Sequence, residues 1–380
     1  MKITLPICFL PLIALMAACG SEAPPGPTHS PRLSLKGAFA DHFRIGAAIN
    51  AKTIMGYDTA GRRLLREEFN TITPENELKW NQLHPARDSF VLDTADAFVE
   101  LGEELNMFTV GHTLVWYLQL SDYVKAVRRP GEMRTVLQEH IDAVAGRYAG
   151  RIDAWDVLNE AVNDDGTMRS WPVYDLLGED YVAEVFKMAR AAAPGAELYY
   201  NDYNLWMPAK RDGAIRMLKK AMAAGAPIDG IGMQAHYSLT KPRLSQVDSS
   251  IQMFYDSLGI KVMITELDVS VLPSPWDYPS GDPRRARVLT PEMNPYAAGL
   301  PDSVGLALGH RYADLFRLFL RHDDKIGRVT LWGVDDGTSW LNYIPIRGRR
   351  DYPLLFDRNH ARKIAYDSVL SLVPVIENRE

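Results

Sequence analysis

Eight short apolar segments recur along the chain, and amphipathic helical patterns fill several of the intervals between them. A strand followed by a helix, repeated in this way, is typical of a parallel α/β fold. Eight such units predict a (β/α)8 TIM barrel, formed as a single domain. A doubly wound open sheet is the alternative. That fold would be expected to carry a glycine-rich phosphate-binding turn after an early strand, and the sequence has none. The apolar segments are residues 43–50, 69–73, 107–114, 152–159, 197–202, 228–236, 260–269 and 326–334.

Three helices can be placed between these segments. Thr135 and Gln138 have the spacing of a capping box, which predicts a helix that starts at Thr135. A second helix is expected over residues 181–193, where a Pro-Gly pair follows. A third is expected over residues 212–224, where a single glycine follows, since proline and glycine end helices.

The first 38 residues differ in composition from the rest of the chain. Lys2 is followed by an apolar run up to Cys19, which resembles a secretory signal and is too short for a membrane-spanning helix. Residues 15–19 resemble a bacterial lipobox, so residues 1–19 are expected to form a lipoprotein-type signal peptide, with Cys19 as the lipidated residue. Residues 20–38 are rich in proline, glycine and serine and predict a flexible tether.

These features predict an exported lipoprotein, anchored on the periplasmic side of a membrane or on the cell surface, with secretion as the second choice. The tether is expected to lead to a barrel domain over residues 39–373 and a C-terminal tail over residues 374–380. Cys8 and Cys19 are the only cysteines, so the mature domain has no disulfide and no thiol chemistry. The net charge is −6 without a long basic run, which argues against binding of nucleic acid.

Polar and aromatic side chains gather where the predicted strands end. In a TIM barrel the active site lies at the carboxyl ends of the strands. Each of these residues could be structural on its own, but seven of the eight segments end in this way. The residues, in chain order, are Glu75, Asn76, Lys79, His112, Trp116, Asn159, Glu160, Asn201, Asp202, Tyr203, Asn204, Gln234, His236, Glu266, Asp268, Trp332 and Trp340.

Two carboxylates stand out because each follows strongly apolar residues. Glu160 ends the fourth segment and Glu266 lies in the seventh, so their side chains can face each other across the mouth of the barrel. Two carboxylates that flank a cleft are what glycoside hydrolysis requires. We expect Glu160 to be the acid and Glu266 the nucleophile, with His236 holding Glu266 ionised and Asp156 fixing the tautomer of His236.

Strand geometry sets a condition on this arrangement. Neighbouring residues of a regular strand point to opposite faces. Asn159 and Glu160 therefore cannot both reach the cleft unless the backbone has a bulge or a kink there, a common feature beside active sites.

The chain resembles glycoside hydrolase family 10, the endo-β-1,4-xylanases. The resemblance rests on seven segments in the family's order: TPENELKW, GHTLVW, WDVLNEAV, NDYN, GIGMQAH, ITELDV and WGVDDGTSW. It implies a retaining mechanism with Glu160 as acid/base and Glu266 as nucleophile, and Asp156 and His236 as supports of the nucleophile. The sugar contacts that it implies are Glu75, Asn76, Lys79, His112, Trp116, Gln119, Asn159, Gln234, Trp332 and Trp340, and we add Tyr203 from the end of the fifth segment.

Two departures from the family pattern concern the cleft. Many members have histidine where this chain has Tyr117, a change expected at the cleft rim without contact to a catalytic group. The stretch of residues 273–301 contains seven prolines and predicts a long loop, expected to shape the aglycone side.

Several functions remain open at this point. The favoured one is a xylanase that acts on xylan and xylo-oligosaccharides, is a monomer and needs no metal or cofactor. A related β-1,4-glycanase acting on xylan and β-glucan, or a non-catalytic glycan-binding lipoprotein, is the alternative. The hypothesis of a metallohydrolase that uses His112 and His236 is weak, because the sequence has no HxH or HExxH spacing.

Overall fold

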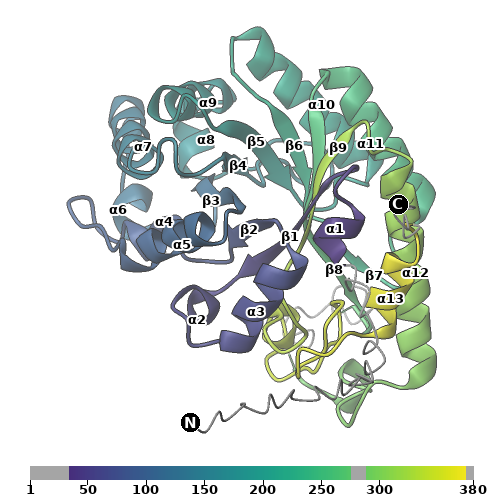
Figure 1. Ribbon diagram of the computed structural model, residues 1–380. Coiled ribbons are helices and arrows are strands. Elements are labelled where there is room, and N and C mark those ends of the chain that lie inside the picture. The colour runs from purple at the N-terminus through teal and green to yellow at the C-terminus, as the bar shows by residue number, and fades with distance from the viewer. Residues whose placement is uncertain (1–33, 275–287, 374–380) are drawn as a thin grey trace, which may run out of the picture. The chain divides into compact units, whose positions relative to one another are not determined.

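The computed structural model describes residues 34–274 and 288–373, which form a ring of parallel strands surrounded by helices (Figure 1). The boundaries agree with the eight predicted segments to within a few residues. The sixth segment alone is divided, into β6 and a short β7. The strands are β1 (Arg44–Ile49), β2 (Thr71–Pro74), β3 (Phe108–Trp116), β4 (Ala154–Asn159), β5 (Glu197–Asp202), β6 (Gly230–Met233), β7 (His236–Ser238), β8 (Lys261–Ser270) and β9 (Ile326–Leu331).

The ring closes with eight strands. Strands β1 to β6 lie side by side in chain order, and β1 also pairs with β9, β9 with β8, and β8 with β6, all in parallel. Strand β7 pairs only with the end of β8, where His236 lies opposite Asp268. The predicted (β/α)8 TIM barrel is therefore confirmed.

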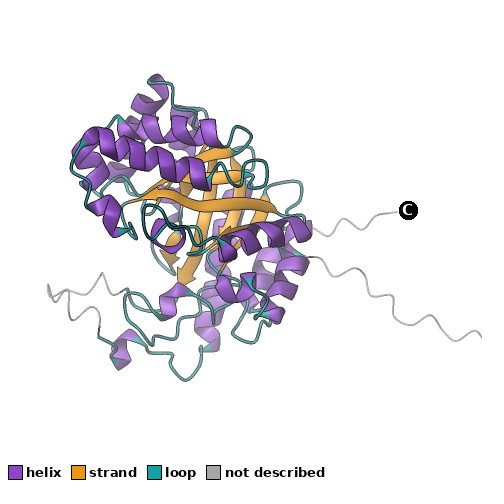
Figure 2. Ribbon diagram, turned by 90° about the vertical axis from the view of Figure 1, so that its left-hand side faces the viewer, coloured by secondary structure: helices purple, strands orange, loops and turns teal. Residues whose placement is uncertain are grey.

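Helices cover the outside of the strands (Figure 2). Apolar side chains on the outer faces of the strands pack against them in one large core. Among the described residues, no helix has both the length and the apolar character needed to cross a membrane. The helices are α1 (Leu35–Ala38), α2 (Ala51–Ile54), α3 (Thr59–Glu68), α4 (Trp80–Leu83), α5 (Asp93–Glu104), α6 (Asp122–Lys125), α7 (Pro130–Val144), α8 (Pro172–Leu177), α9 (Tyr181–Ala192), α10 (Pro208–Ala223), α11 (Leu244–Leu258), α12 (Asp302–Leu320) and α13 (Ile364–Leu370), with 3-10 turns η3 (Pro291–Met293) and η4 (Trp340–Asn342).

The three predicted helices exist, but two of their starts were wrong. Helix α7 begins at Pro130 rather than at Thr135, whose hydroxyl donates to the carbonyl oxygen of Gly131 at 3.2 Å inside the helix. Proline at the first helical position presets the backbone for a helix and overrides the capping signal further along. Helix α9 matches its prediction to one residue, and α10 starts four residues earlier than predicted, again at a proline.

The folded domain begins before the predicted boundary at residue 39. Leu35 in α1 is fully buried, and its backbone N–H donates to Glu68 at 2.9 Å. These contacts hold α1 on the barrel, so residues 35–38 do not belong to the tether. The predicted signal peptide with Cys19, the tether up to residue 33, residues 275–287 of the long loop and the tail over residues 374–380 lie outside the described residues.

The barrel interior is layered, and the layers place the site. Four apolar side chains from four strands form a cluster separate from the outer core. Two residues further along each strand, on the same face, comes a buried polar side chain. The apolar layer thus forms a floor beneath a polar layer at the carboxyl ends. The pairs are Val110 and His112, Ala154 and Asp156, Tyr199 and Asn201, and Met263 and Thr265.

Candidate active site

The backbone is distorted where β4 ends, as the sequence requires. Pairing between β4 and β5 shifts between Asp156 and Leu158, so that Asp156 and Asn159 both face inward. Glu160 then has a φ of +59°, a left-handed conformation that is uncommon for a residue with a side chain. As a result, Asn159 and Glu160 reach the same amide group: Nε2 of Gln234 lies 3.4 Å from Asn159 Oδ1 and 2.9 Å from Glu160 Oε1.

Glu160 is held by neutral donors. The indole Nε1 of Trp116 donates to Oε2 at 2.9 Å, and the amide of Gln234 donates to Oε1 at 2.9 Å. The left-handed backbone is fixed from two sides. The N–H of Glu160 donates to the carbonyl oxygen of Asn201 at 2.9 Å, and Nε of Arg169 donates to the carbonyl oxygen of Glu160 at 2.8 Å.

Glu266 is held by a histidine and an amide. Nδ2 of Asn201 donates to Oε1 at 2.7 Å, and Nε2 of His236 lies 3.2 Å from Oε2. Burial acts to raise the pKa of Glu266, but the hydrogen bonds and the nearby imidazoles outweigh it, so this pKa is lowered from the usual value. Glu266 is therefore ionised at neutral pH, as a nucleophile must be.

The aspartate that supports His236 is Asp268, not Asp156 as the sequence predicted. Oδ2 of Asp268 lies 3.0 Å from Nδ1 of His236, while Oδ2 of Asp156 lies 2.9 Å from Nδ1 of His112. Strand pairing explains the difference, because β7 places His236 opposite Asp268 and β3 places His112 opposite Asp156. The sequence held one signal for this choice, the two-residue spacing that puts Glu266 and Asp268 on one face of a strand.

His236 carries a positive charge between two carboxylates. Burial opposes this charge, but Asp268 and Glu266 more than compensate, and together they raise the pKa of His236 to about 10. The imidazolium is thus a charge-assisted donor to Glu266. Asp268 also accepts a hydrogen bond from the indole Nε1 of Trp340 at 2.8 Å, which fixes its orientation.

A chain of amides connects the two glutamates. Nδ2 of Asn201 contacts both Glu266 Oε1 at 2.7 Å and Asn159 Oδ1 at 3.1 Å, and Gln234 continues from Asn159 to Glu160. The hydroxyl of Thr265 donates to Oδ1 of Asn201 at 2.6 Å and sets which way this amide faces. The sequence places Asn201 at a strand end but does not mark it as a site residue, because its bond to Glu266 joins two strands.

A second cluster of polar side chains, formed by Glu75, Asn76 and Lys79, lies beside Glu160 and Glu266. Nζ of Lys79 is 3.0 Å from Oδ1 of Asn76 and 4.9 Å from the ring centre of Trp116. Burial lowers the pKa of Lys79, although the charges of Glu266, Glu75 and Glu160 oppose this. Burial also raises the pKa of Glu75 to about 7, with Lys79 acting against it. Such buried donors and acceptors can bond sugar hydroxyls.

Aromatic rings enclose the same space. The rings of Trp332 and His112 meet edge to face at 5.4 Å, and the rings of Trp340 and His236 lie 4.9 Å apart. Both tryptophans therefore contact histidines that pair with site carboxylates. Ring faces beside polar groups suit a sugar, which has apolar C–H faces and a polar rim.

Among the described residues, two predicted sugar contacts, Gln119 and Tyr203, form no direct hydrogen bond with either glutamate. Gln119 has a φ of +52°, its carbonyl oxygen accepts from Asn81 at 3.0 Å, and in the described part of the chain its side chain has no bond to the other site residues. The hydroxyl of Tyr203 accepts from Arg169 at 2.9 Å. The centre of the Tyr203 ring lies 3.3 Å from Nζ of Lys210. Tyr203 thus reaches Glu160 only through Arg169.

Tyr117 is closer to the acid/base candidate than its rim position suggested. The guanidinium of Arg169 lies 4.2 Å from the ring centre of Tyr117 and bonds the backbone of Glu160. Burial, together with the charge of Glu160, raises the pKa of Tyr117 to about 12. Arg169 was missed in the sequence, since nothing local in the sequence links it to the end of β4.

A family model described as glycosyl hydrolase family 10 matches residues 34–372. The chain belongs to this family.

Relatives in family 10 match over most of their length. The chain is 36% identical to endo-1,4-beta-xylanase A of Xylanibacter ruminicola, covering 89% of this chain and 93% of that protein. It is 37% identical to a beta-1,4-xylanase of Dictyoglomus thermophilum, covering 88% and 89%. Among solved structures, a family 10 endoxylanase retrieved from a sugarcane soil metagenome has 42% identity and a TM-score of 0.85, covering 90% of this chain and all of that one (100%).

His112 and His236 each bond a different aspartate, and they do not form a joint set of ligands. Within residues 34–274 and 288–373, the one group of three histidine, cysteine or acidic side chains that could share an ion lies elsewhere, at Asp58, Asp335 and His360.

Proposed function

We propose that this chain is a retaining endo-β-1,4-xylanase that uses Glu160 as general acid/base and Glu266 as nucleophile. The observation that carries the proposal is the contrast between the two carboxyl groups. Glu266 accepts from a protonated imidazole and an amide, whereas Glu160 accepts from a neutral indole and an amide. The first environment favours the anion more strongly than the second, which separates the roles of nucleophile and acid.

The reaction proceeds in two displacements. In the first, Glu160 gives its proton to the glycosidic oxygen, the bond between the anomeric carbon and that oxygen breaks, and a carboxylate oxygen of Glu266 bonds to the anomeric carbon. In the second, Glu160 takes a proton from water, the water oxygen bonds to the anomeric carbon, and Glu266 leaves as a carboxylate. Two inversions at one carbon retain the β configuration.

Asn159 supports the same steps from beside Glu160. Its Oδ1 accepts from Asn201 at 3.1 Å and lies 3.4 Å from the amide of Gln234, while its Nδ2 is 3.5 Å from Glu160. The amide orientation is therefore set before substrate binds. A preset donor near the reacting carbon can bond a sugar hydroxyl more strongly in the transition state than in the ground state.

Xylan is the substrate that the relatives support. The relatives from Xylanibacter ruminicola and Dictyoglomus thermophilum are named as xylanases, and a solved xylanase from Thermotoga petrophila, 29% identical to this chain with a TM-score of 0.79, is described in complex with xylobiose. Activity on β-glucan is the second candidate, since a glucose unit differs from xylose by one CH2OH group. A non-catalytic role is not favoured, because both glutamates are present with their partners.

One experiment tests activity and roles together. Release of reducing ends from xylan and from carboxymethylcellulose is measured for the wild type, Glu160→Ala and Glu266→Ala, with Glu179→Ala, a surface residue paired with Lys220, as matched control. We expect activity on xylan that the control keeps and both site variants lose by a factor of about 10³ or more. Full activity in Glu266→Ala would refute the mechanism, and binding of xylan without hydrolysis by the wild type would favour the lectin-like function.

Two further measurements resolve the two glutamates. Proton NMR of fresh products reports the anomeric configuration, and an initial α product would contradict retention. Addition of azide, which needs no base, should restore activity of Glu160→Ala on an activated aryl xylobioside and give a β-azide. The same addition should give an α-azide with Glu266→Ala.

We propose in addition that the protein is exported and held on a membrane by lipid at Cys19, and that it acts as a monomer. The support is the apolar leader that ends in Cys19. Cys19→Ser should move the protein from the membrane fraction to the soluble exported fraction, and equal fractionation of the two forms would refute the anchor. Sedimentation at micromolar concentration should give the mass of one chain.

A further inference from the structure

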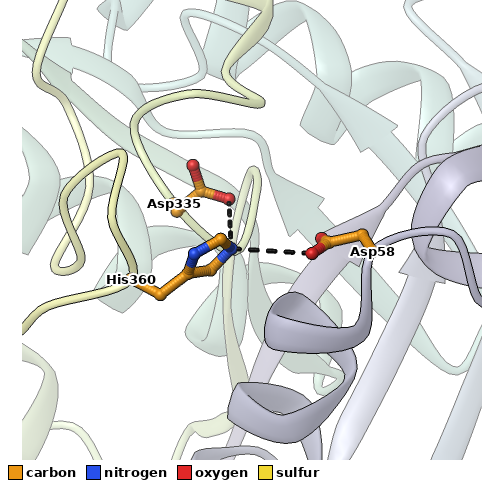
Figure 3. Close-up of side chains that lie close together, drawn as sticks. All are labelled: Asp58, Asp335 and His360. Atoms are coloured by element: carbon orange, nitrogen blue, oxygen red, sulfur yellow. Dashed lines mark ion pairs between the residues drawn. The ribbon is translucent and has the colours of Figure 1, made fainter.

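Three ligand-type side chains from distant segments converge outside the cleft (Figure 3). Asp58 precedes helix α3, Asp335 lies in the loop after β9, and His360 lies in the turn before α13. Asp335 is almost fully buried, while the side chains of Asp58 and His360 are about four-fifths buried, with exposures of 18% and 20%. The close-up shows both carboxylates facing the same ring nitrogen of His360.

The distances do not fit hydrogen bonds. Nε2 of His360 lies 3.6 Å from Oδ1 of Asp58 and 3.6 Å from Oδ2 of Asp335, beyond the usual range for such bonds. Nε2 is buried and has no hydrogen-bond partner among the described residues. Other histidine–aspartate pairs of this chain are closer, at 2.8, 2.9, 3.0 and 2.5 Å, and these are His42–Asp323, His112–Asp156, His236–Asp268 and His322–Asp248.

The same distances fit ligands that share one ion. Zinc is bound by histidine nitrogen at about 2.0–2.1 Å and by carboxylate oxygen at about 2.0–2.2 Å, in tetrahedral geometry. Two ligand atoms at the tetrahedral angle are then about 3.4 Å apart. The three atoms here lie within 4.8 Å of one another, with Nε2 at 3.6 Å from both oxygens. An ion between them would also give the buried Nε2 a partner.

The carboxylates are oriented by the surrounding chain. The backbone N–H of Gly61 donates to Asp58 at 2.8 Å and the hydroxyl of Thr53 at 3.1 Å. Oδ1 of Asp335 accepts from the N–H of Gly337 at 2.6 Å, and Oδ2, which faces His360, accepts from the hydroxyl of Thr338 at 3.3 Å. Hydrogen bonds of this kind orient metal ligands in proteins.

The cluster also has a surplus of negative charge. In residues 34–274 and 288–373, no lysine or arginine nitrogen forms an ion pair with Asp58 or Asp335. Asp335 is almost fully buried, so its carboxylate has little solvent to compensate its charge. A bound cation would supply that compensation.

We propose that Asp58, Asp335 and His360 bind one divalent transition-metal ion of the zinc type, with water in the fourth position. The imidazole argues against calcium and magnesium, which prefer oxygen ligands only. The ion would join the start of α3, the loop between Trp332 and Trp340, and the segment that leads into α13. It stabilises the fold at the edge of the cleft and takes no part in the chemistry at Glu160 and Glu266.

The test uses the full chain without a histidine tag, freed of metal by a chelator. Zinc alone is added, and bound zinc is measured by equilibrium dialysis and the unfolding temperature by calorimetry. Asp58→Asn keeps an N-cap acceptor for α3, and His360→Asn suits a φ of +63°, which asparagine tolerates. His42→Asn removes a histidine from a surface pair with Asp323 and is the matched control.

We expect one zinc per chain and a raised unfolding temperature for the wild type and His42→Asn, because a ligand of the native state stabilises it. Zinc should bind at least about tenfold more weakly to Asp58→Asn and to His360→Asn. Cobalt in place of zinc should give visible absorption of a tetrahedral site that both variants lose. Equal zinc binding by wild type and His360→Asn, or no binding by wild type, would overturn the proposal and leave an ion pair of His360 with the two carboxylates. If one of the two variants does not fold, zinc binding by the other variant decides whether the cluster binds the ion.

Discussion

Replacing Asp268 by asparagine removes the charge that keeps His236 protonated. Asp268 is almost fully buried and lies 3.0 Å from Nδ1 of His236, whose other nitrogen lies 3.2 Å from Glu266. Without this carboxylate only Glu266 opposes the effect of burial, so we expect the pKa of His236 to fall from about 10 and the imidazole to lose its charge. Glu266 then loses its charged donor, so we expect its pKa to rise.

The magnitude follows from the lost interaction. A hydrogen bond to a charged group contributes about 1.5–3 kcal/mol, which corresponds to roughly a 10- to 100-fold loss in kcat/KM. The same loss moves the pKa of Glu266 upward, because its anion then lacks one charged donor. The direct repulsion between Asp268 and Glu266 acts in the opposite direction, but the imidazolium lies between them and is nearer to Glu266, so its loss dominates.

The assay is the pH profile of kcat/KM on an aryl β-xylobioside. Because Glu266 must be ionised to attack, the acidic limb should move to higher pH in Asp268→Asn. Asp323→Asn changes another histidine-bound aspartate, on the surface, and should leave the limb in place. Asp156→Asn should move it less, since Asp156 bonds His112, which affects Glu266 only through its charge.

Two results would refute this reasoning. An unchanged acidic limb in Asp268→Asn would mean that His236 does not set the pKa of Glu266. A larger shift in Asp156→Asn than in Asp268→Asn would restore the support that the sequence suggested. Circular dichroism of each variant distinguishes these outcomes from loss of the fold.

Three further changes test the packing and charges around the site. Lys210→Met removes the fully buried partner that lies 3.0 Å from Asp202, and the uncompensated carboxylate should cost about 3–5 kcal/mol of unfolding free energy, measured in guanidinium chloride. Gly111→Ala places a Cβ 2.2 Å from the ring of Trp155 and should cost about 1–3 kcal/mol; an unchanged midpoint would contradict that contact. Glu75 has a folded pKa raised to about 7, so its contribution to stability is present below pH 4.5 and is lost as the pH rises through 7. Relative to Glu75→Gln, the wild type should therefore lose about 1–3 kcal/mol between pH 4.5 and pH 8, and parallel stability curves for the two proteins would show that Glu75 does not titrate in this way.

Local sequence was sufficient for the framework of the fold. Apolar runs such as residues 43–50 matched a strand to within one residue at each end, because a buried parallel strand needs a nearly continuous apolar stretch. Local patterns were less reliable at helix starts, where Pro130 took precedence over the capping signal at Thr135. The kink after Asn159 was also predictable, since two neighbouring polar residues at a strand end cannot share a face without it.

The sequence by itself determined which chemical groups stand at the carboxyl ends of the strands, because residue type and strand ends are local properties. Only the tertiary structure decided which groups meet. Whether His236 bonds Asp156 or Asp268 depends on the register of β7 against β8, and the bond between Asn201 and Glu266 depends on closure of the ring. The convergence of Asp58, Asp335 and His360 likewise joins three distant segments, so no local pattern in the chain could indicate it.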